Sequence, residues 1–226
     1  MLCVPIPSHM LIFLDTANLD EIRHAARLGV LRGVTTNPSI AAKEGITDLA
    51  GYKKAVLEIV DIVNGPVSAE VVSSQTSDMV NEGREIASWN PNVVVKIPST
   101  LEGLEAIHSL SADGIRVNQT LCFSVNQAIL GAAAGATYVS PFVGRLDDEG
   151  HDGIELISDI VNIFDIYSIT TKVLAASIRG PLHCLEAAKA GSHIATLPYK
   201  VLLQMMHHTL TDVGLARFTQ DWQGKT

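Results

Sequence analysis

Eight short runs of β-forming residues alternate with amphipathic stretches along the chain, and this alternation constrains the fold more than any other feature. Several runs consist almost entirely of valine, isoleucine and leucine, which is typical of parallel strands buried on both faces. The expected strands are Leu11–Ala17, Gly33–Pro38, Pro66–Val71, Val93–Pro98, Arg116–Cys122, Thr137–Val143, Thr171–Ile178 and His193–Pro198.

The stretches between these runs carry the signals of helix ends. Asn18 and Glu21 have the spacing of a capping box, and Ser124 is expected to cap a second helix. Gly29 and Gly191 are among the glycines expected to end helices in the left-handed conformation. The expected helices are Asn18–Leu28, Ser73–Trp89, Leu101–Leu110, Ser124–Ala134, Ile154–Phe164, Pro181–Ala190, Tyr199–His208 and Thr209–Trp222.

Eight strand–helix units in one chain predict an α/β fold: a closed (β/α)8 TIM barrel with an extra C-terminal helix, 209–222. The main alternative is an open doubly wound sheet, which usually carries a glycine-rich phosphate loop after its first strand. Here that junction, Asp15–Asn18, contains no glycine. We expect a single domain over residues 10–226, with residues 1–9 as an N-terminal extension, because Met10 directly precedes the first periodic run.

The composition fits a globular protein with a large core. Hydrophobic residues make up 47% and charged residues 18% of the 226 residues, and the formal net charge is −8. With no block of lysine and arginine, nucleic acid is not an expected partner, and no apolar run approaches the ~18 residues of a membrane span. The odd cysteine count (Cys3, Cys122, Cys184) and the absence of a CxxC or Cys/His cluster argue against disulfides and zinc. They favour a cytoplasmic location.

Polar side chains stand at the ends of these apolar runs, where the chemistry of a TIM barrel is located. Such groups are unfavourable to bury unless they are paired or used. The candidates at strand ends are Asp15, Asn37, Glu70, Lys96, Asn118, Thr120, Ser140, Phe142 and Ser177, and those in the loops after strands six and seven are Arg145 and Arg179.

Lys96 is the sharpest of these candidates, because three valines precede it and an Ile-Pro pair follows. Burial favours the neutral amine of a lysine, and a neutral amine can attack a carbonyl carbon. The alternative is a lysine that extends from the strand end to solvent. An inward Asp15 on a nearby strand would form an acid/base pair with Lys96, whereas the alternative for Asp15 is to cap the following helix.

Two pairs of candidates are spaced by two residues, so each pair should share one face of its strand. Asn118 and Thr120 form the pair on the fifth strand, and Ser140 and Phe142 the pair on the sixth. The alternative for each pair is a satisfied core or capping role.

Arg145, Ser177 and Arg179 together indicate an anion clamp, because Ser177 and Arg179 would share a face and arginine binds phosphate through a planar fork. The alternative is that each arginine is solvated and contacts a helix end. The acidic run 147–149 is expected to be a solvated loop, and His183, like the other helix histidines, is expected at the surface or an interface.

Seven segments, each on a different expected strand, form a distinctive set. They are LDTAN (14–18), GVTTNPS (33–39), VSAEV (67–71), VVKIP (94–98), Asn118-x-Thr120, YVSPFVGR (138–145) and AASIR (175–179). In this order they resemble the transaldolase family, and specifically its short-chain branch, from Leu11 to about Tyr199.

The resemblance implies a transferase that moves a dihydroxyacetone unit between sugar phosphates without a metal or cofactor. The implied reaction converts sedoheptulose 7-phosphate and glyceraldehyde 3-phosphate into erythrose 4-phosphate and fructose 6-phosphate. The resemblance also implies a homo-oligomer, commonly a decamer built from pentameric rings and joined partly through a helix such as Thr209–Trp222.

Roles for individual residues follow from the same resemblance. Lys96 is implied to form the Schiff base and Asp15 to act as acid/base during carbon–carbon cleavage. Glu70 is implied to act through a water held by Thr120. The residues implied to bind substrate are Asn37, Asn118 and Ser140 for the dihydroxyacetone hydroxyls, Arg145, Ser177 and Arg179 for the phosphate, and Phe142 at the mouth.

Two other functions stay open on the sequence. Fructose 6-phosphate aldolases, which belong to the same branch, carry Gln where Glu70 stands and Tyr where Phe142 stands; this chain has the transaldolase residue at both positions. The other class is a non-catalytic sugar-phosphate-binding barrel. The set of Lys96, Asp15 and Glu70 argues against it, because binding alone needs no buried amine.

Overall fold

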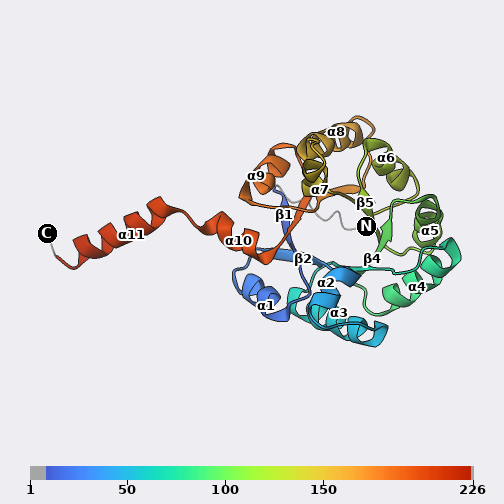
Figure 1. Cartoon of the computed structure of the whole chain (residues 1–226), viewed down its shortest axis with the longest axis horizontal. Coiled ribbons are helices and arrows are strands. Elements are labelled where there is room, and N and C mark those ends of the chain that lie inside the picture. The colour runs from blue at the N-terminus through green and yellow to red at the C-terminus, as the bar shows by residue number, and fades with distance from the viewer. Residues whose placement is uncertain (1–8, 225–226) are drawn as a thin grey trace.

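The computed structural model describes residues 9–224 and contains a closed barrel of parallel strands that pair in sequence order (Figure 1). The pairing of Leu11 with Ile194 joins the last strand to the first and closes the barrel, as predicted. The N-terminal extension expected over residues 1–9 lies, apart from His9, outside the described residues. The strands are β1 (Leu11–Asp15), β2 (Leu31–Thr35), β3 (Val67–Glu70), β4 (Val93–Pro98), β5 (Val117–Cys122), β6 (Tyr138–Pro141), β7 (Lys172–Ala175) and β8 (Ile194–Leu197).

Helices surround this barrel and cover the outer faces of its strands (Figure 1). Gly29 and Gly191 follow helices at φ angles of 74° and 81°, which confirms the predicted left-handed ends. The helices are α1 (Leu19–Arg27), α2 (Pro38–Lys43), α3 (Leu49–Val63), α4 (Thr76–Ser88), α5 (Leu101–Ala112), α6 (Val125–Ala133), α7 (Val143–Asp148), α8 (Gly153–Ile166), α9 (Pro181–Lys189), α10 (Tyr199–Met206) and α11 (Thr209–Trp222).

The sequence pattern does not predict three of these helices, α2, α3 and α7. The first and last have only six residues each, which is too short to show a helical period. Helix α3 has its own end signals: Asp48 accepts a hydrogen bond from the Gly51 N–H at 2.7 Å, and Asn64 ends the helix in the left-handed conformation. Both α2 and α3 lie beside the mouth of the barrel, so their side chains bear on the site described below.

The capping box expected at the start of α1 is only half formed. The Asn18 side chain accepts hydrogen bonds from the N–H groups of Asp20 and Glu21, as an N-cap should. The Glu21 carboxylate, however, accepts the Thr16 hydroxyl at 2.7 Å, and Thr16 in turn accepts the Asn18 N–H. A reciprocal bond from Glu21 to Asn18 was therefore a wrong prediction.

The interior of the barrel is filled by apolar side chains below the level of the site. Phe13 is 1% exposed and belongs to a small cluster with Leu174, Ala176 and Ile194. A Cβ at position 33 would lie 2.5 Å from the Phe13 ring, so only glycine fits there. Because Phe13 and Asp15 are two residues apart on β1, this ring forms the floor under the polar mouth.

Helix α11 has the bounds predicted from the sequence, and it extends away from the barrel (Figure 1). None of its residues is buried, and its large side chains Phe218 and Trp222 are 70% and 91% exposed. Among residues 9–224, no helix is both long and apolar enough to cross a membrane.

Candidate active site

A two-lobed cavity opens at the carboxyl ends of the strands, the end where TIM barrels carry their chemistry. One lobe has a volume of about 340 Å³ and the other about 460 Å³, and both are lined by Asn37, Ser39, Lys96, Phe142 and Arg145. All the candidates from the sequence except Asn118 line at least one lobe. The structure therefore brings together side chains that lie on seven different strands or in the segments that follow them.

Lys96 is buried in the barrel wall rather than extended to solvent, since only 4% of the residue is exposed. Strand β3 pairs with β4 so that Glu70 is directly beside Lys96, and the Glu70 carboxylate contacts Lys96 Nζ at 2.9 Å. The same ammonium nitrogen lies 3.5 Å from the carbonyl oxygen of Thr36. The predicted inward lysine is confirmed, and its charge is compensated by an adjacent acid.

Asp15 faces the cavity from the end of β1 and accepts a 2.7 Å hydrogen bond from the Thr35 hydroxyl. Burial raises the pKa of Asp15 above its ordinary value, although the Lys96 charge and the Thr35 hydrogen bond act in the opposite direction. Asn18, not Asp15, caps α1, so the capping alternative for Asp15 is wrong. A carboxyl group with a raised pKa suits general acid/base catalysis near neutral pH.

Asn118 lies behind the cavity in a buried chain of hydrogen bonds. The Ser140 hydroxyl donates to Asn118 Oδ1 at 2.6 Å, and Asn118 Nδ2 donates to the Ser68 hydroxyl at 3.1 Å. In this arrangement Asn118 orients Ser140, which does line the cavity. These two bonds leave one N–H and one oxygen lone pair of the Asn118 amide unused, but the residue is fully buried and lines neither lobe.

Thr120 follows Asn118 by two residues on β5 and lines the same lobe as Glu70. Its hydroxyl oxygen is buried and has no hydrogen-bond partner within the described part of the chain. A buried hydroxyl normally has a partner, so this one is available to bind a water or a substrate group beside Glu70.

Two candidates reach the cavity from helix starts rather than from the predicted strand ends. Strand β2 ends at Thr35 because Pro38 begins α2, and the Asn37 side chain caps that helix by accepting the Ile40 N–H at 2.9 Å. Strand β6 ends at Pro141, but Phe142 continues the pairing as an isolated parallel bridge with Ala176 and lines the same lobe as Ser140. Its ring sits at the start of α7.

The ring of Phe142 is held by two neighbours. Phe123 packs edge-on against it with the ring centroids 5.5 Å apart. The Arg145 guanidinium carbon lies 5.8 Å from the centroid of the Phe142 ring, within the range of a cation–π contact. Arg145 itself lies inside α7 and not in a loop, which corrects the prediction.

The segment after β7 adopts an unusual backbone conformation that brings Ser177 and Arg179 to the cavity. Strand β7 ends at Ala175 and Ser177 has a φ of 58°, so the predicted strand face shared by Ser177 and Arg179 does not exist. The Ser177 carbonyl oxygen accepts the Gly144 N–H at 3.0 Å. A Cβ at position 144 would lie 2.3 Å from that oxygen, so glycine is needed for α7 to approach so closely.

Arg179 is held by the acidic end of α7. Its guanidinium contacts the Asp148 carboxylate at 2.6 Å, and its backbone N–H donates to His183 Nδ1 at 3.2 Å. His183 Nε2 lies 3.0 Å from Asp147, which completes a second link between the two segments. Residues 147–149 are exposed as predicted, but Asp147 and Asp148 belong to α7 rather than to a loop, and partly buried His183 links α9 to that helix.

Sequence reasoning missed several polar residues of the site. Thr35 bonds Asp15 and also the Thr196 hydroxyl at 2.7 Å, and Lys43 lines the cavity from α2. The two-residue alternation from Gly33 could have pointed to Thr35, whereas Lys43 lies on a helix that the sequence pattern does not reveal. Within residues 9–224, no cluster of three or more His, Cys, Asp or Glu side chains could hold a metal ion.

A buried lysine with carboxylates beside it, facing a cavity with arginines at the open end of a TIM barrel, is typical of enzymes that form a Schiff base with a sugar phosphate. Residues 12–225 match the family described as Transaldolase/Fructose-6-phosphate aldolase, and the chain belongs to that family.

Similar proteins agree with this assignment. A "Probable transaldolase" of Dehalococcoides mccartyi is 60% identical over 95% of this chain and 98% of its own length. A second, of Desulforudis audaxviator, is 60% identical over 94% of this chain and 97% of its own length.

Two solved structures share the fold at only 14% identity. A mandelate oxidase mutant with an FMN adduct has a TM-score of 0.56 and matches over 84% of this chain and 64% of that one. A cube-shaped protein cage designed by fusing symmetric oligomeric domains has a TM-score of 0.60 and matches over 96% and 77%. These likenesses concern the barrel alone.

Proposed function

We propose that this protein is a transaldolase that moves a dihydroxyacetone unit from a ketose phosphate to an aldose phosphate through a Schiff base on Lys96. The observation that carries the proposal is the buried Lys96–Glu70 pair, which faces the same cavity as Asp15 and the two arginines. The proposed donor is sedoheptulose 7-phosphate and the acceptor glyceraldehyde 3-phosphate. The products are erythrose 4-phosphate and fructose 6-phosphate, with no metal or cofactor.

Imine formation begins with the loss of a proton from the Lys96 ammonium, and Glu70 Oε2 at 2.9 Å is positioned to accept it. The amine nitrogen then attacks the ketone carbon of the donor, and the carbonyl oxygen leaves as water. Thr120 has a free hydroxyl in the same lobe as Glu70, so it can hold the water that enters or leaves in this step.

Carbon–carbon cleavage requires a base for the hydroxyl group on the fourth carbon of the donor. In the proposal Asp15 takes that proton, the bond between the third and fourth carbons breaks, and its electron pair moves into the iminium group to give an enamine. The aldehyde product leaves, while the enamine stays attached to Lys96. The raised pKa of Asp15 fits a group that must both take and return a proton.

Transfer is the reverse sequence with another aldehyde. The enamine carbon attacks the acceptor's carbonyl carbon, Asp15 returns its proton to the new hydroxyl oxygen, and water hydrolyses the imine to release the new ketose. In the proposal the Asn37 and Ser140 side chains, with Asn118 behind Ser140, bind the dihydroxyacetone hydroxyls.

The phosphate of either sugar is proposed to lie against Arg145, Ser177 and Arg179, which converge on one lobe although they come from two different segments. Lys43 lines the same lobe and adds a further positive charge. Arginine suits a phosphate because its planar fork can donate two parallel hydrogen bonds.

A lyase of the fructose 6-phosphate aldolase type is the second candidate within the family. Phe142 favours transfer, because its ring occupies the mouth between Phe123 and Arg145 and offers no hydroxyl that could hold or activate a water. Without such a group, the enamine on Lys96 is more readily captured by an aldehyde than protonated and hydrolysed.

We further propose a cytosolic homo-oligomer, with rings of five subunits that pair into a decamer. Helix α11 supports this, because Leu210, Val213, Leu215, Phe218 and Trp222 are all exposed on a helix that extends from the barrel (Figure 1). Large apolar side chains that are this exposed are unfavourable in water and fit contact with a second copy of the chain.

The activity is tested by measuring the consumption of a ketose phosphate with and without an aldose phosphate. A transaldolase consumes fructose 6-phosphate rapidly only when erythrose 4-phosphate is present, and it releases sedoheptulose 7-phosphate and glyceraldehyde 3-phosphate. Equal consumption without an acceptor would identify a lyase. Phosphate binding without turnover would indicate a binding protein.

A further inference from the structure

The backbone hydrogen bonds between β2 and β3 stop at the level of the proposed catalytic groups. The register joins Thr35 with Ser68, and the Thr36 N–H donates to the Ser68 carbonyl oxygen at 2.9 Å. A regular parallel ladder would next join the Glu70 N–H to the Thr36 carbonyl oxygen. Instead the Glu70 N–H donates to the hydroxyl of Tyr52, a side chain of α3, at 3.1 Å. Tyr52 thus replaces the missing rung of the ladder.

This replacement changes what the Thr36 carbonyl oxygen contacts. Because Tyr52 takes the Glu70 N–H, the oxygen of Thr36 is left for Lys96 Nζ, which lies 3.5 Å away. The Glu70 carboxylate contacts the same nitrogen at 2.9 Å. The Lys96 amine thus contacts the Thr36 carbonyl oxygen and the Glu70 carboxylate. Tyr52 connects the two backbone segments that carry these groups.

The directions of the hydrogen bonds around Tyr52 follow from the geometry. The Thr36 hydroxyl donates to the Ser68 carbonyl oxygen at 2.9 Å, so its proton is already used. It therefore accepts the Tyr52 O–H at 2.7 Å, and the Tyr52 oxygen accepts the Glu70 N–H. Burial raises the pKa of Tyr52 to about 12, so the hydroxyl keeps its proton at neutral pH.

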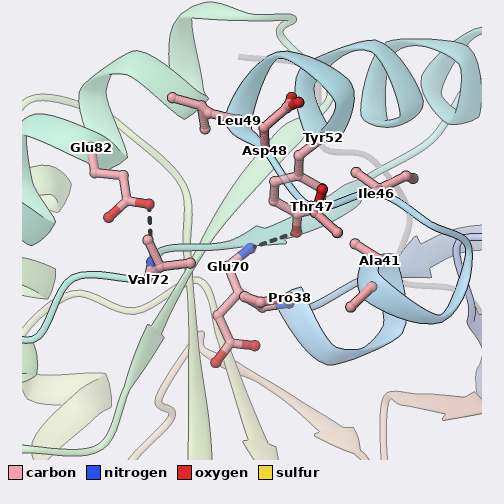
Figure 2. A pocket seen from close by; sticks show the side chains of 11 residues that line it. Pro38, Ala41, Ile46, Thr47, Asp48, Leu49, Tyr52, Glu70, Val72 and Glu82 are labelled. Carbon is pink, nitrogen blue, oxygen red and sulfur yellow. Dashed lines mark hydrogen bonds between the residues drawn. The ribbon is translucent and has the colours of Figure 1, made fainter.

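The Tyr52 ring is fixed by packing outside the catalytic cavity. Trp89 lies edge-on to it, with centroids 6.1 Å apart and an interplanar angle of 88°. Figure 2 shows the hydroxyl turned toward the Glu70 backbone while the ring lines an apolar pocket of about 360 Å³. On the other side of Glu70, the Glu82 carboxylate accepts the N–H groups of Val72 and Ser73 at 2.9 and 3.1 Å. The chain is thus held on both sides of Glu70.

We propose that Tyr52 is a positioning residue for imine formation: its hydroxyl joins the ends of β2 and β3 and so fixes Glu70 and the Thr36 carbonyl oxygen on the Lys96 amine. Tyr52 touches neither substrate nor the reacting atoms and acts through these two residues. The inference rests on the proposed Schiff-base function, since it concerns the step in which Lys96 loses a proton and attacks the ketone.

The test is Tyr52→Phe, which keeps the ring and its packing but removes the hydroxyl. The rate of imine formation is measured by rapid mixing with fructose 6-phosphate and quenching with borohydride, and inorganic phosphate is titrated as a competitive inhibitor. We expect imine formation to slow at least about tenfold, since small displacements of catalytic groups have effects of up to 10²-fold. The phosphate inhibition constant should stay within about twofold, because the arginines are held by α7 and the β7–α9 segment.

Trp89→Phe is the matched control, because it disturbs the packing of Tyr52 but leaves the hydroxyl bonds in place. It should keep the wild-type imine rate even where its melting temperature falls as far as that of Tyr52→Phe. Thr36→Val, which removes the acceptor of the Tyr52 proton, should slow imine formation on its own and add little to Tyr52→Phe. If Tyr52→Phe does not fold, the test rests on Thr36→Val alone, which should still form the imine more slowly than the wild-type protein.

The inference is overturned if Tyr52→Phe forms the imine at the wild-type rate, or if Trp89→Phe slows it equally. An additive effect of Thr36→Val would also contradict it, because two residues of one network should not act independently. A wild-type protein that forms no imine would overturn the proposed function and this inference together. If the wild-type protein forms the imine and the variants form it at the same rate, only the role of Tyr52 is overturned.

Discussion

Arg179 already holds a carboxylate in this structure, and that contact sets how far phosphate binding should change when either partner is replaced. The Arg179 and Asp148 side chains are 55% and 61% exposed, and their charged atoms lie 2.6 Å apart. An exposed ion pair contributes only about 0.2–1 kcal/mol, whereas a charge-assisted hydrogen bond to a phosphate contributes about 1.5–3 kcal/mol. A substrate phosphate bound by Arg179 is therefore expected to displace Asp148.

The two replacements should act in opposite directions. Asp148→Asn removes the competitor, so phosphorylated ligands should bind roughly 1.4- to 5-fold more tightly. Arg179→Ala loses the phosphate contact but no longer has to break the ion pair. The net loss is about 0.5–2.8 kcal/mol, or roughly 2- to 100-fold weaker binding.

The assay compares inhibition by inorganic phosphate with binding of free dihydroxyacetone. Lys189→Ala is the matched control, since it removes an exposed positive charge that is paired with Glu186 on α9, away from the cavity. It should change neither ligand. Weaker phosphate binding in Asp148→Asn would show that Asp148 orients Arg179 rather than competes for it. Equal losses of phosphate and dihydroxyacetone in Arg179→Ala would refute the clamp.

Three further predictions concern other parts of the molecule. Phe142→Tyr should raise acceptor-independent cleavage relative to transfer, because a phenol can hold and activate a water near the imine; an unchanged ratio of free dihydroxyacetone to transfer product would mean that the ring only packs the mouth. Asp15→Asn should abolish turnover yet raise the melting temperature at neutral pH. The folded-state pKa of Asp15 lies above its ordinary value of 3.8, so ionisation lowers stability as the pH rises between the two values, and the variant should lack this loss; an unchanged pH dependence of unfolding would contradict it. Replacing Leu215 and Phe218 of α11 by serine should dissociate the oligomer without unfolding the barrel, as light scattering and circular dichroism would report; a wild-type monomer at micromolar concentration would sink the oligomer proposal.

The sequence was sufficient to predict the barrel and the lysine because both depend on local patterns. Runs of valine and isoleucine predict the strands, and a lysine within such a run, as in Val94–Ile97, stands out against its neighbours. The same logic placed Asp15 and Glu70 at strand ends, where the structure has them. Two-residue alternation predicts which side chains share a face only as far as the strand continues.

It failed where the chain left the strand earlier than its composition suggested. Phe142 and Ser177 both lie beyond the last residue of their strands, so their direction depends on a helix start and on a left-handed residue. The pattern of apolar residues predicts neither the early end of β6 nor the turn at Ser177. Both result from contacts between segments, such as the Gly144 N–H bond to the Ser177 carbonyl oxygen.

The groups that support the site were also invisible in the sequence. Tyr52 lies on α3, a helix missing from the sequence-based expectation, and it is 18 residues away from the Glu70 N–H that it accepts. Asp148 and Arg179 are 31 residues apart. Packing between neighbouring βα units brings such pairs together, and the spacing along the chain carries no information about them.

The central claim is that Lys96 is the nucleophile, and borohydride reduction in the presence of fructose 6-phosphate tests it most directly. The reduced protein is digested and the labelled peptide identified by mass. We expect a dihydroxyacetone-sized addition on the peptide that contains Lys96 and none in Lys96→Met. Lys43 lines the same cavity and serves as an internal control. A label on Lys43, or no label on any lysine, would show that Lys96 is not the nucleophile.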